Sequence, residues 1–194
     1  MEGSGVIDLV KLHDHKPLFG LVARQLAYPD KRTFQPVEPE TGFGPNIADL
    51  LSAFWNKINQ LSMDEIEELY VQTFDFQKSS TLYMTHAKFE DSRERGAMLA
   101  TMKSIYEMYG LEIADNELAD YLPLMCEFLY AAQWLNHEHA EESFKTLFAV
   151  MEDGTYELLK ALENMRSPYY ELVKALRETL KQCLRQEVTA SGHD

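Results

Sequence analysis

The chain has 194 residues and a net charge of −14, and 45% of its residues are hydrophobic. This length and apolar content suit one folded domain with a buried core and argue against a disordered chain. The acidity opposes binding to nucleic acid or to an anionic membrane surface and favours a cationic partner, unless it serves solubility alone.

The start of the chain, residues 1–5, lacks the basic and apolar regions of a signal peptide, and no run of about 18 apolar residues occurs. We therefore expect a soluble, cytoplasmic protein. Cys126 and Cys183 form no CxxC motif and lie on predicted apolar helix faces. They are predicted to be reduced core residues rather than a disulfide or a metal site.

The first helix is expected over 15–28, with Asp14 as its cap and Tyr28-Pro29-Asp30 at its end. Three prolines and two glycines in 32–45 predict a loop. Asn46 is expected to cap a second helix, whose apolar residues repeat at helical spacing. This stripe consists of Ile47, Leu50, Leu51, Phe54, Ile58 and Leu61.

Residues 62–65, Ser-Met-Asp-Glu, form a capping box and start the next helix, whose apolar stripe ends near Phe74. Phe76 falls off that stripe, and a polar loop over 77–81 precedes Tyr83. An exposed aromatic residue at a helix end is one ingredient of a binding surface. The alternative is that Phe76 and Tyr83 pack beneath the loop.

Asp91 or Ser92 is predicted to cap the following helix, which Gly110 ends in a left-handed conformation. Arg93 and Arg95 lie in its first turn, where cations oppose the helix dipole. Some other group must therefore compensate the charges of these two arginines. Pairing with nearby acids such as Glu90 and Asp91 is one explanation, and contact with a ligand is the other.

The chain is organised around an acidic segment that leads into an apolar helix. Six carboxylates and no Lys or Arg lie between Glu107 and Glu127. Asp120 is the candidate N-cap of the helix, with Pro123 in its first turn, and we interpret 110–123 as a hinge. An acidic rim beside an apolar groove suits an amphipathic helix that carries Lys or Arg.

Two further helices are expected over 138–151 and 155–164, separated by Asp153-Gly154, and Ser167-Pro168 opens the last helix. Residues 188–194 are expected to fray. About eight helices with no convincing strand predict an all-α, single-domain helical bundle that spans 1–194.

Neither a phosphate-binding Gly-rich loop nor a GxSxG motif is present. His137 and His139 are separated by one residue, so on a helix they point in different directions and do not form a metal site. Glu117 and Asp120 are spaced for acid–base work, but no nucleophile accompanies them. We therefore expect no enzyme, no catalytic residue, no bound metal and no cofactor.

Three segments together resemble a known family: LYVQTFDF at 69–76, DSRERG at 91–96 and ELADYLPLMCEFL at 117–129. They are similar to the NarJ proteins, the delta subunit of respiratory nitrate reductase, within the wider group of TorD-like molybdoenzyme chaperones. The resemblance covers about 18–128, with the rest similar only as a helical pattern. It implies a TorD/NarJ-like helical bundle.

The resemblance also implies a function and a partner. Such a protein binds the N-terminal segment of the apo catalytic subunit of respiratory nitrate reductase. It supports insertion of the molybdenum cofactor and the iron–sulfur clusters before the complex docks on its membrane subunit. We expect a monomer or a weak homodimer. The alternatives are a chaperone for a trimethylamine-oxide or dimethyl-sulfoxide reductase, and a weak nucleotide hydrolase.

The matched motifs, together with the aromatic residues at the helix end, supply the candidate residues for binding the client peptide. These are Tyr70, Phe74, Asp75, Phe76, Tyr83, Asp91, Arg93, Glu117, Asp120 and Tyr121. The chain departs from the usual hinge signature of the wider group at Ala119, where a proline is typical, and at Tyr121, where a histidine is typical. A role that depends on that imidazole is therefore in question here.

Overall fold

A computed structural model describes residues 6–30, 42–90, 92–114 and 116–185. The predicted loop over 32–45 lies mostly outside this part of the chain, and the predicted frayed tail lies wholly outside it. The described residues form nine α-helices, one π-helix, one 3₁₀-helix and two short strands. In chain order the elements are β1 (Val6–Ile7), α1 (Leu9–Asp14), α2 (Lys16–Leu26), α3 (Pro45–Ile58), α4 (Met63–Tyr70), η1 (Val71–Asp75), η2 (Lys78–Ser80), α5 (His86–Phe89), α6 (Arg93–Met108), α7 (Leu122–Ala131), α8 (Ala140–Asn164), α9 (Tyr169–Gln182) and β2 (Leu184–Arg185).

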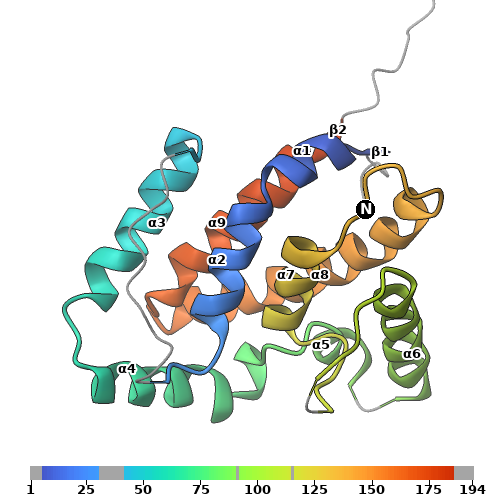
Figure 1. Cartoon of the computed structure of the whole chain (residues 1–194). Helices are drawn as coiled ribbons and strands as arrows, with labels where there is room; N and C mark the ends of the chain where they lie inside the picture. The colour runs from blue at the N-terminus through green and yellow to red at the C-terminus, as the bar shows by residue number, and fades with distance from the viewer. Residues whose placement is uncertain (1–5, 31–41, 91, 115, 186–194) are drawn as a thin grey trace, which may run out of the picture.

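The helices pack around one core, in which α9 contacts α2, α3 and α8 while α2 lies against α7 (Figure 1). Aromatic side chains fill much of this core. Tyr169 of α9 packs on Phe54 of α3 at 5.7 Å and on Phe74 of η1 at 4.9 Å between ring centroids. The predicted all-α class and helical bundle are confirmed.

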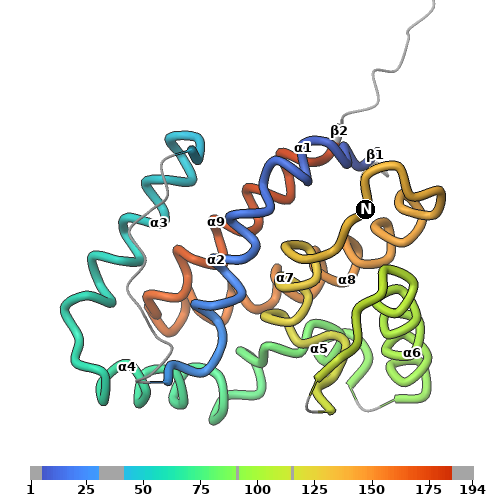
Figure 2. The backbone as a smooth tube through the Cα atoms, in the orientation of Figure 1, coloured from blue at the N-terminus to red at the C-terminus, as the bar shows by residue number. Residues whose placement is uncertain are grey.

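The two ends of the described chain meet in a small antiparallel pairing of β1 with β2 (Figure 2). The amide of Asp8 also donates to the carbonyl oxygen of Cys183 at 2.7 Å. Sequence patterning does not detect these strands because two residues are too few to show alternation. No helix in the described part of the chain is long and apolar enough to cross a membrane.

Several helix starts agree with the sequence and others do not. Ser62 and Glu65 form the predicted capping box, and the hydroxyl of Ser92 accepts a hydrogen bond from the amide of Arg95. The predicted caps Asp14 and Asn46 are wrong: α1 and α2 are separate helices that meet at His15, and α3 starts after Gly44. Pro45 begins α3 because its fixed φ and missing N–H suit the first helical turn.

The predicted break at Asp153-Gly154 is also wrong, since α8 runs unbroken through it. A Cβ atom on Gly154 would lie 2.6 Å from the backbone oxygen of Met84. The glycine therefore permits close contact with the segment at Met84 and does not end the helix. Beside it, the guanidinium of Arg177 donates to the hydroxyl of Thr155 at 2.7 Å and to the backbone oxygen of Glu152 at 2.8 Å.

Both cysteines are buried and free, as predicted. Burial raises the pKa of the Cys126 thiol, and it raises the pKa of Cys183 to about 12. His137 and His139 lie in the turn before α8 rather than on the helix, and the ring of His137 packs against Tyr109 at 4.6 Å between centroids.

Candidate functional site

An open groove of about 530 Å³ lies between α2 and α7. Its lining residues come from α2 with the residue after it, from the segment before α7, and from α7 itself. They are Gly20, Ala23, Arg24, Ala27, Ala114, Glu117, Tyr121, Pro123, Leu124, Glu127 and Tyr130. Small and apolar side chains make up most of this lining, so the groove can receive apolar side chains from another chain.

The width of the groove depends on how closely α2 approaches α7. A Cβ atom on Gly20 would lie only 2.8 Å from the ring of Tyr130, so the ring packs directly on the backbone of α2. Tyr130 keeps 48% of its surface exposed and forms part of the groove wall. Gly20 therefore sets the helix spacing that leaves the groove open beside it.

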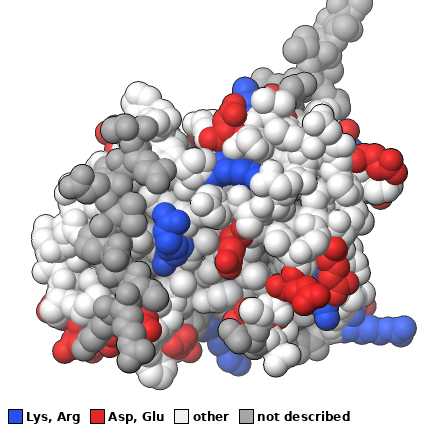
Figure 3. Space-filling view, in the orientation of Figure 1, with Lys and Arg blue, Asp and Glu red and all other residues white. Residues whose placement is uncertain are grey.

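Charged groups of both signs lie along the groove. Arg24 comes from α2, whereas Glu117 and Glu127 come from the segment before α7 and from α7. The face over α2 and α7 is otherwise mostly uncharged, and acidic side chains gather over the C-terminal end of α6 (Figure 3). An occupant with a cation beside Glu117 or Glu127 would meet favourable charge there.

Four tyrosines and Glu117 connect the groove to the helix-end motif. The hydroxyl of Tyr121 lies 3.3 Å from that of Tyr70, which donates to the backbone oxygen of Leu26 at 3.1 Å. Tyr83 donates to the carboxylate of Glu117 at 3.1 Å. Burial raises the pKa of Tyr70, and it raises the pKa of Tyr83 to about 12, so both stay neutral hydrogen-bond donors near neutral pH.

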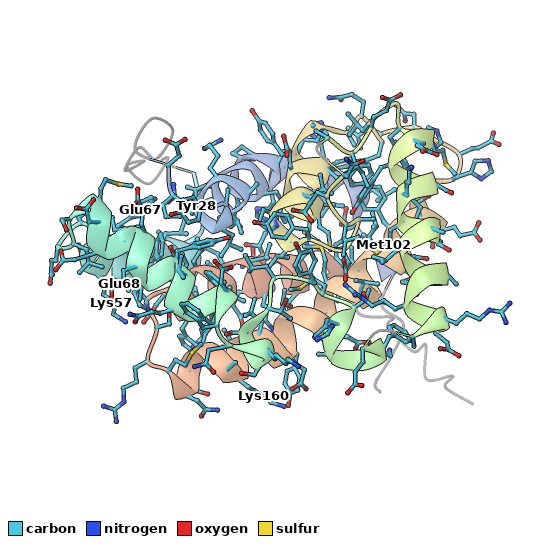
Figure 4. The ribbon with its side chains drawn as sticks, turned by 90° about the horizontal axis from the view of Figure 1, so that it is seen from below. Tyr28, Lys57, Glu67, Glu68, Met102 and Lys160 are labelled. Carbon is cyan, nitrogen blue, oxygen red and sulfur yellow. The ribbon has the colours of Figure 1, made fainter. Side chains whose placement is uncertain are left out.

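Tyr28 is the fourth tyrosine beside the candidate site, and the sequence predicts it only as the end of a helix. Its ring packs edge-on against Tyr70 with centroids 5.4 Å apart. From below, Tyr28 is seen between α2 and α4 (Figure 4). The side chain is 52% exposed and follows Ala27 of the groove lining. Its only signal in the sequence was an aromatic residue before Pro29.

Asp120 is fully buried and does not cap α7, so the predicted N-cap and exposed acidic role are both wrong. The helix begins after Tyr121 without a side-chain cap, although Pro123 lies in its first turn as predicted. The Oδ2 atom of Asp120 accepts hydrogen bonds from the amide of Thr85 at 3.0 Å and from its hydroxyl at 2.5 Å. A third bond comes from the guanidinium of Arg95 at 3.3 Å.

The backbone explains why Asp120 points inward. The amide of Met84 donates to the oxygen of Asp120 at 2.9 Å, and the amide of Leu122 donates to the oxygen of Leu82 at 2.8 Å. This short antiparallel contact presents the side chain of Asp120 to Thr85. The sequence indicates that Arg95 is a cation in need of a partner, but it does not predict the pairing with Asp120, 25 residues away.

Three aromatic residues predicted to bind the client, Phe74, Phe76 and Tyr83, do not share one environment. Phe74 is 7% exposed and packs against Tyr169 in the core, whereas Phe76 is 78% exposed. The π-helix η1 over Val71–Asp75 is a wider turn, so it changes the direction of the side chains that follow the stripe of α4. Tyr83 is half-buried beside Glu117.

The other predicted residues lie in different surroundings. Tyr70 is buried next to the groove, and Tyr121 lines it. Asp75 and Arg93 are exposed, and neither lines the groove. Asp91 lies outside the described residues. The structure thus brings Glu117 and Tyr121 into the groove lining and places Tyr70, Tyr83 and Asp120 behind it.

A second, larger hollow of about 910 Å³ lies between α8 and the segment from η2 to α5. Lys78, His86, Phe89 and Lys160 are among its lining residues, and Figure 4 shows Lys160 on α8 at the edge of the molecule. None of the described client-binding candidates lines this hollow, so the groove between α2 and α7 is the stronger candidate site.

Taken together, the fold and the groove define an all-helical bundle with a surface that can receive a segment of another chain. A family model described as "Nitrate reductase delta subunit" matches residues 39–186. The chain belongs to this family, which confirms the resemblance drawn from the three motifs.

Named relatives agree with this assignment. The chain is 32% identical over 174 residues to the "Probable nitrate reductase molybdenum cofactor assembly chaperone NarJ" of Bacillus subtilis (strain 168), covering 87% of this chain and 90% of the relative. It is 26% identical over 138 residues to the "Nitrate reductase molybdenum cofactor assembly chaperone NarJ" of Escherichia coli (strain K12), covering 68% of this chain and 57% of that relative.

Proposed function

We propose that this protein is a nitrate reductase molybdenum cofactor assembly chaperone and that the groove between α2 and α7 binds its client. The client is the N-terminal segment of the apo catalytic subunit. The protein holds this subunit, without catalytic activity of its own, while the molybdenum cofactor and iron–sulfur clusters enter it. It acts in the cytoplasm, before the assembled complex docks on its membrane subunit.

The single observation that carries the choice of site is the convergence of the three family motifs. Glu117 and Tyr121 of the third motif line the groove, Tyr70 of the first bonds to Tyr121, and Arg95 of the second bonds to Asp120. Motifs that are separated along the chain thus meet beside one surface.

The groove suits an amphipathic helical segment better than an extended strand. Its walls are two helices, and Gly20, Ala23 and Ala27 leave room for a helix to approach closely. A bound helix would place apolar side chains on this floor and basic side chains beside Glu117 and Glu127. Affinity would then come mainly from apolar contact, since an exposed ion pair contributes only about 0.2–1 kcal/mol.

Calorimetric titration with a synthetic peptide of the client N-terminus tests this proposal. Wild-type protein is expected to bind one peptide. Ala23→Glu places a charged chain in the groove lining and should abolish binding while the thermal melt stays close to wild type. Ala100→Glu, an exposed position on α6 outside the groove, is the matched control and should bind normally.

Two results would refute parts of the proposal. Failure of the wild-type protein to bind the nitrate reductase peptide would exclude this client. Tight binding of the corresponding peptide from trimethylamine-oxide or dimethyl-sulfoxide reductase would instead identify that reductase as the client. Normal binding by Ala23→Glu would move the client site away from this groove.

A further inference from the structure

The buried carboxylate of Asp120 joins three segments that are distant in sequence. Its Oδ2 atom accepts from both the amide and the hydroxyl of Thr85, 35 residues away, and from Arg95. The Nε atom of Arg95 also donates to the hydroxyl of Thr85 at 3.0 Å. Carboxylate, hydroxyl and guanidinium thus form a closed cluster, which we call the Asp120 cluster.

Hydrogen bonds to the backbone hold the same segment on either side of Asp120. The bridge between Tyr83 and Tyr121 aligns the two stretches of chain, and the hydroxyl of Tyr106 donates to the oxygen of Ala119 at 2.7 Å. Residues 119–122 are therefore held against 82–85 and α6. Within residues 82–85 and 119–122, Asp120 carries the one carboxylate.

The segment that carries Asp120 also forms part of the groove wall. Glu117 precedes Asp120 by three positions and Tyr121 follows it directly, and both line the groove. Glu117 also accepts from Tyr83, which belongs to the stretch that the Asp120 cluster fixes. A change in the position of Asp120 would therefore move both groove residues.

The electrostatics make Arg95 important to this arrangement. The side chain of Asp120 has no exposed surface, and its Oδ1 atom has no hydrogen-bond partner among the described residues. Removing one partner of a buried ion pair leaves an uncompensated charge, which is far more costly than losing a surface pair. Movement of Asp120 toward water would relieve that cost, and it would disturb residues 117–121.

We propose that Arg95 and Thr85 are positioning residues for client binding, acting through Asp120 to hold Glu117 and Tyr121 in the groove wall. This inference rests on the proposed function, because it takes the groove between α2 and α7 as the client-binding site. Neither residue lines the groove, so neither needs to touch the client.

Amide hydrogen exchange measured on the full chain tests the positioning role without any client. Arg95→Leu should speed exchange in the peptides that carry Met84 and Leu122 by about tenfold or more, while peptides of α9 keep their wild-type rate. Arg95→Lys keeps the charge and should restore part of the protection. Lys103→Leu removes a cation from the same helix, where it is 62% exposed beside Glu107, and should leave exchange unchanged.

Thr85→Val provides a second route if Arg95→Leu does not fold. It removes the hydroxyl that links Asp120 to Arg95, keeps the backbone amide and nearly preserves the shape of the side chain. The same peptides should exchange faster. Both variants should bind the client peptide about tenfold more weakly, and Lys103→Leu should bind it like wild type.

The outcomes separate the two proposals. Wild-type exchange at Met84 and Leu122 in both Arg95→Leu and Thr85→Val would overturn the positioning role, whatever the affinity. Faster exchange with unchanged affinity would also overturn it. If wild-type protein does not bind the peptide, the proposed function fails, and the exchange measurement alone decides whether Arg95 and Thr85 fix this wall.

Discussion

Gly154 offers the clearest test of whether close packing outweighs local helix preference. In a helix interior, Gly→Ala stabilises a protein by up to about 1 kcal/mol through helix propensity. At Gly154, however, the new Cβ would lie 2.6 Å from the oxygen and 2.7 Å from the Cα of Met84. Both are backbone atoms of the segment that pairs with Asp120, so they cannot rotate away as a flexible side chain would.

Overpacking of this kind costs about 1–3 kcal/mol, which exceeds the gain in propensity. Because the contacts here are with backbone atoms, we take the upper part of this range, about 2–3 kcal/mol. After a propensity gain of about 1 kcal/mol is subtracted, we expect Gly154→Ala to lower the free energy of unfolding by about 1–2 kcal/mol. For a chain of this size each kcal/mol corresponds to about 2–4 °C in Tm, so the melt should move down by about 2–8 °C.

Thermal and urea unfolding followed by circular dichroism would measure the change. Gly96→Ala is the matched control, because Gly96 lies in α6 and a Cβ there meets nothing within 4 Å. It should stabilise by about 0.5–1 kcal/mol. Stabilisation of both variants to the same degree would refute the argument that contact with Met84 selects glycine at position 154.

Three other substitutions test separate parts of the structure. Ser62→Ala removes the capping box of α4 and should cost about 1 kcal/mol in urea unfolding, and an unchanged midpoint would contradict the cap. Glu117→Gln keeps an acceptor for Tyr83 but loses the charge, so client binding should weaken by about 0.2–1 kcal/mol with a smaller salt dependence. Glu112→Gln, outside the groove, should not change it. Burial lowers the pKa of His15 below 6.5, so its contribution to stability is present above pH 6.5 and is lost as the pH falls through the lowered folded-state pKa. His15→Gln should remove that part of the acid sensitivity, and identical pH profiles of unfolding free energy for His15→Gln and wild type would show that His15 contributes none.

Local signals in the sequence were sufficient for much of the fold. The capping box at Ser62, the cap at Ser92 and the left-handed Gly110 each depend on groups within a few residues, and each occurs in the structure. Apolar stripes likewise located most helices. These features are predictable because their partners are close along the chain.

The errors arose where a distant contact decides the local structure. Gly154 resembled a helix break, but contact with Met84, far away in the sequence, explains the glycine within a continuous α8. Asp120 resembled an N-cap, but Thr85 and Arg95 provide its partners from 35 and 25 residues away. No pattern within one helix contains either contact.

The candidate site could be predicted only in part, because it too depends on contacts between segments that are distant in the sequence. Motif resemblance selected Glu117 and Tyr121, which the groove contains, yet it grouped Phe74, which lies in η1 and is buried in the core, with exposed Phe76. Arg24 and Tyr130 were missed because their role arises from the approach of α2 to α7 at Gly20. A groove between two helices is a property of their packing rather than of either sequence.

The acidic segment from Glu107 to Glu127 therefore serves more than one purpose. Asp120 is internal and structural, Glu107 pairs with Lys103 on the surface of α6, and Glu117 and Glu127 line the groove. Surface charges act over about one Debye length, near 8–10 Å at moderate salt, so they favour the approach of a basic segment before contact. In the proposed complex, apolar contact in the groove would then govern the dissociation rate of the bound segment. If the groove binds the client as proposed, the net charge of −14 should set mainly the rate of client capture, whereas the spacing of α2 and α7 and the Asp120 cluster should set the lifetime of the complex.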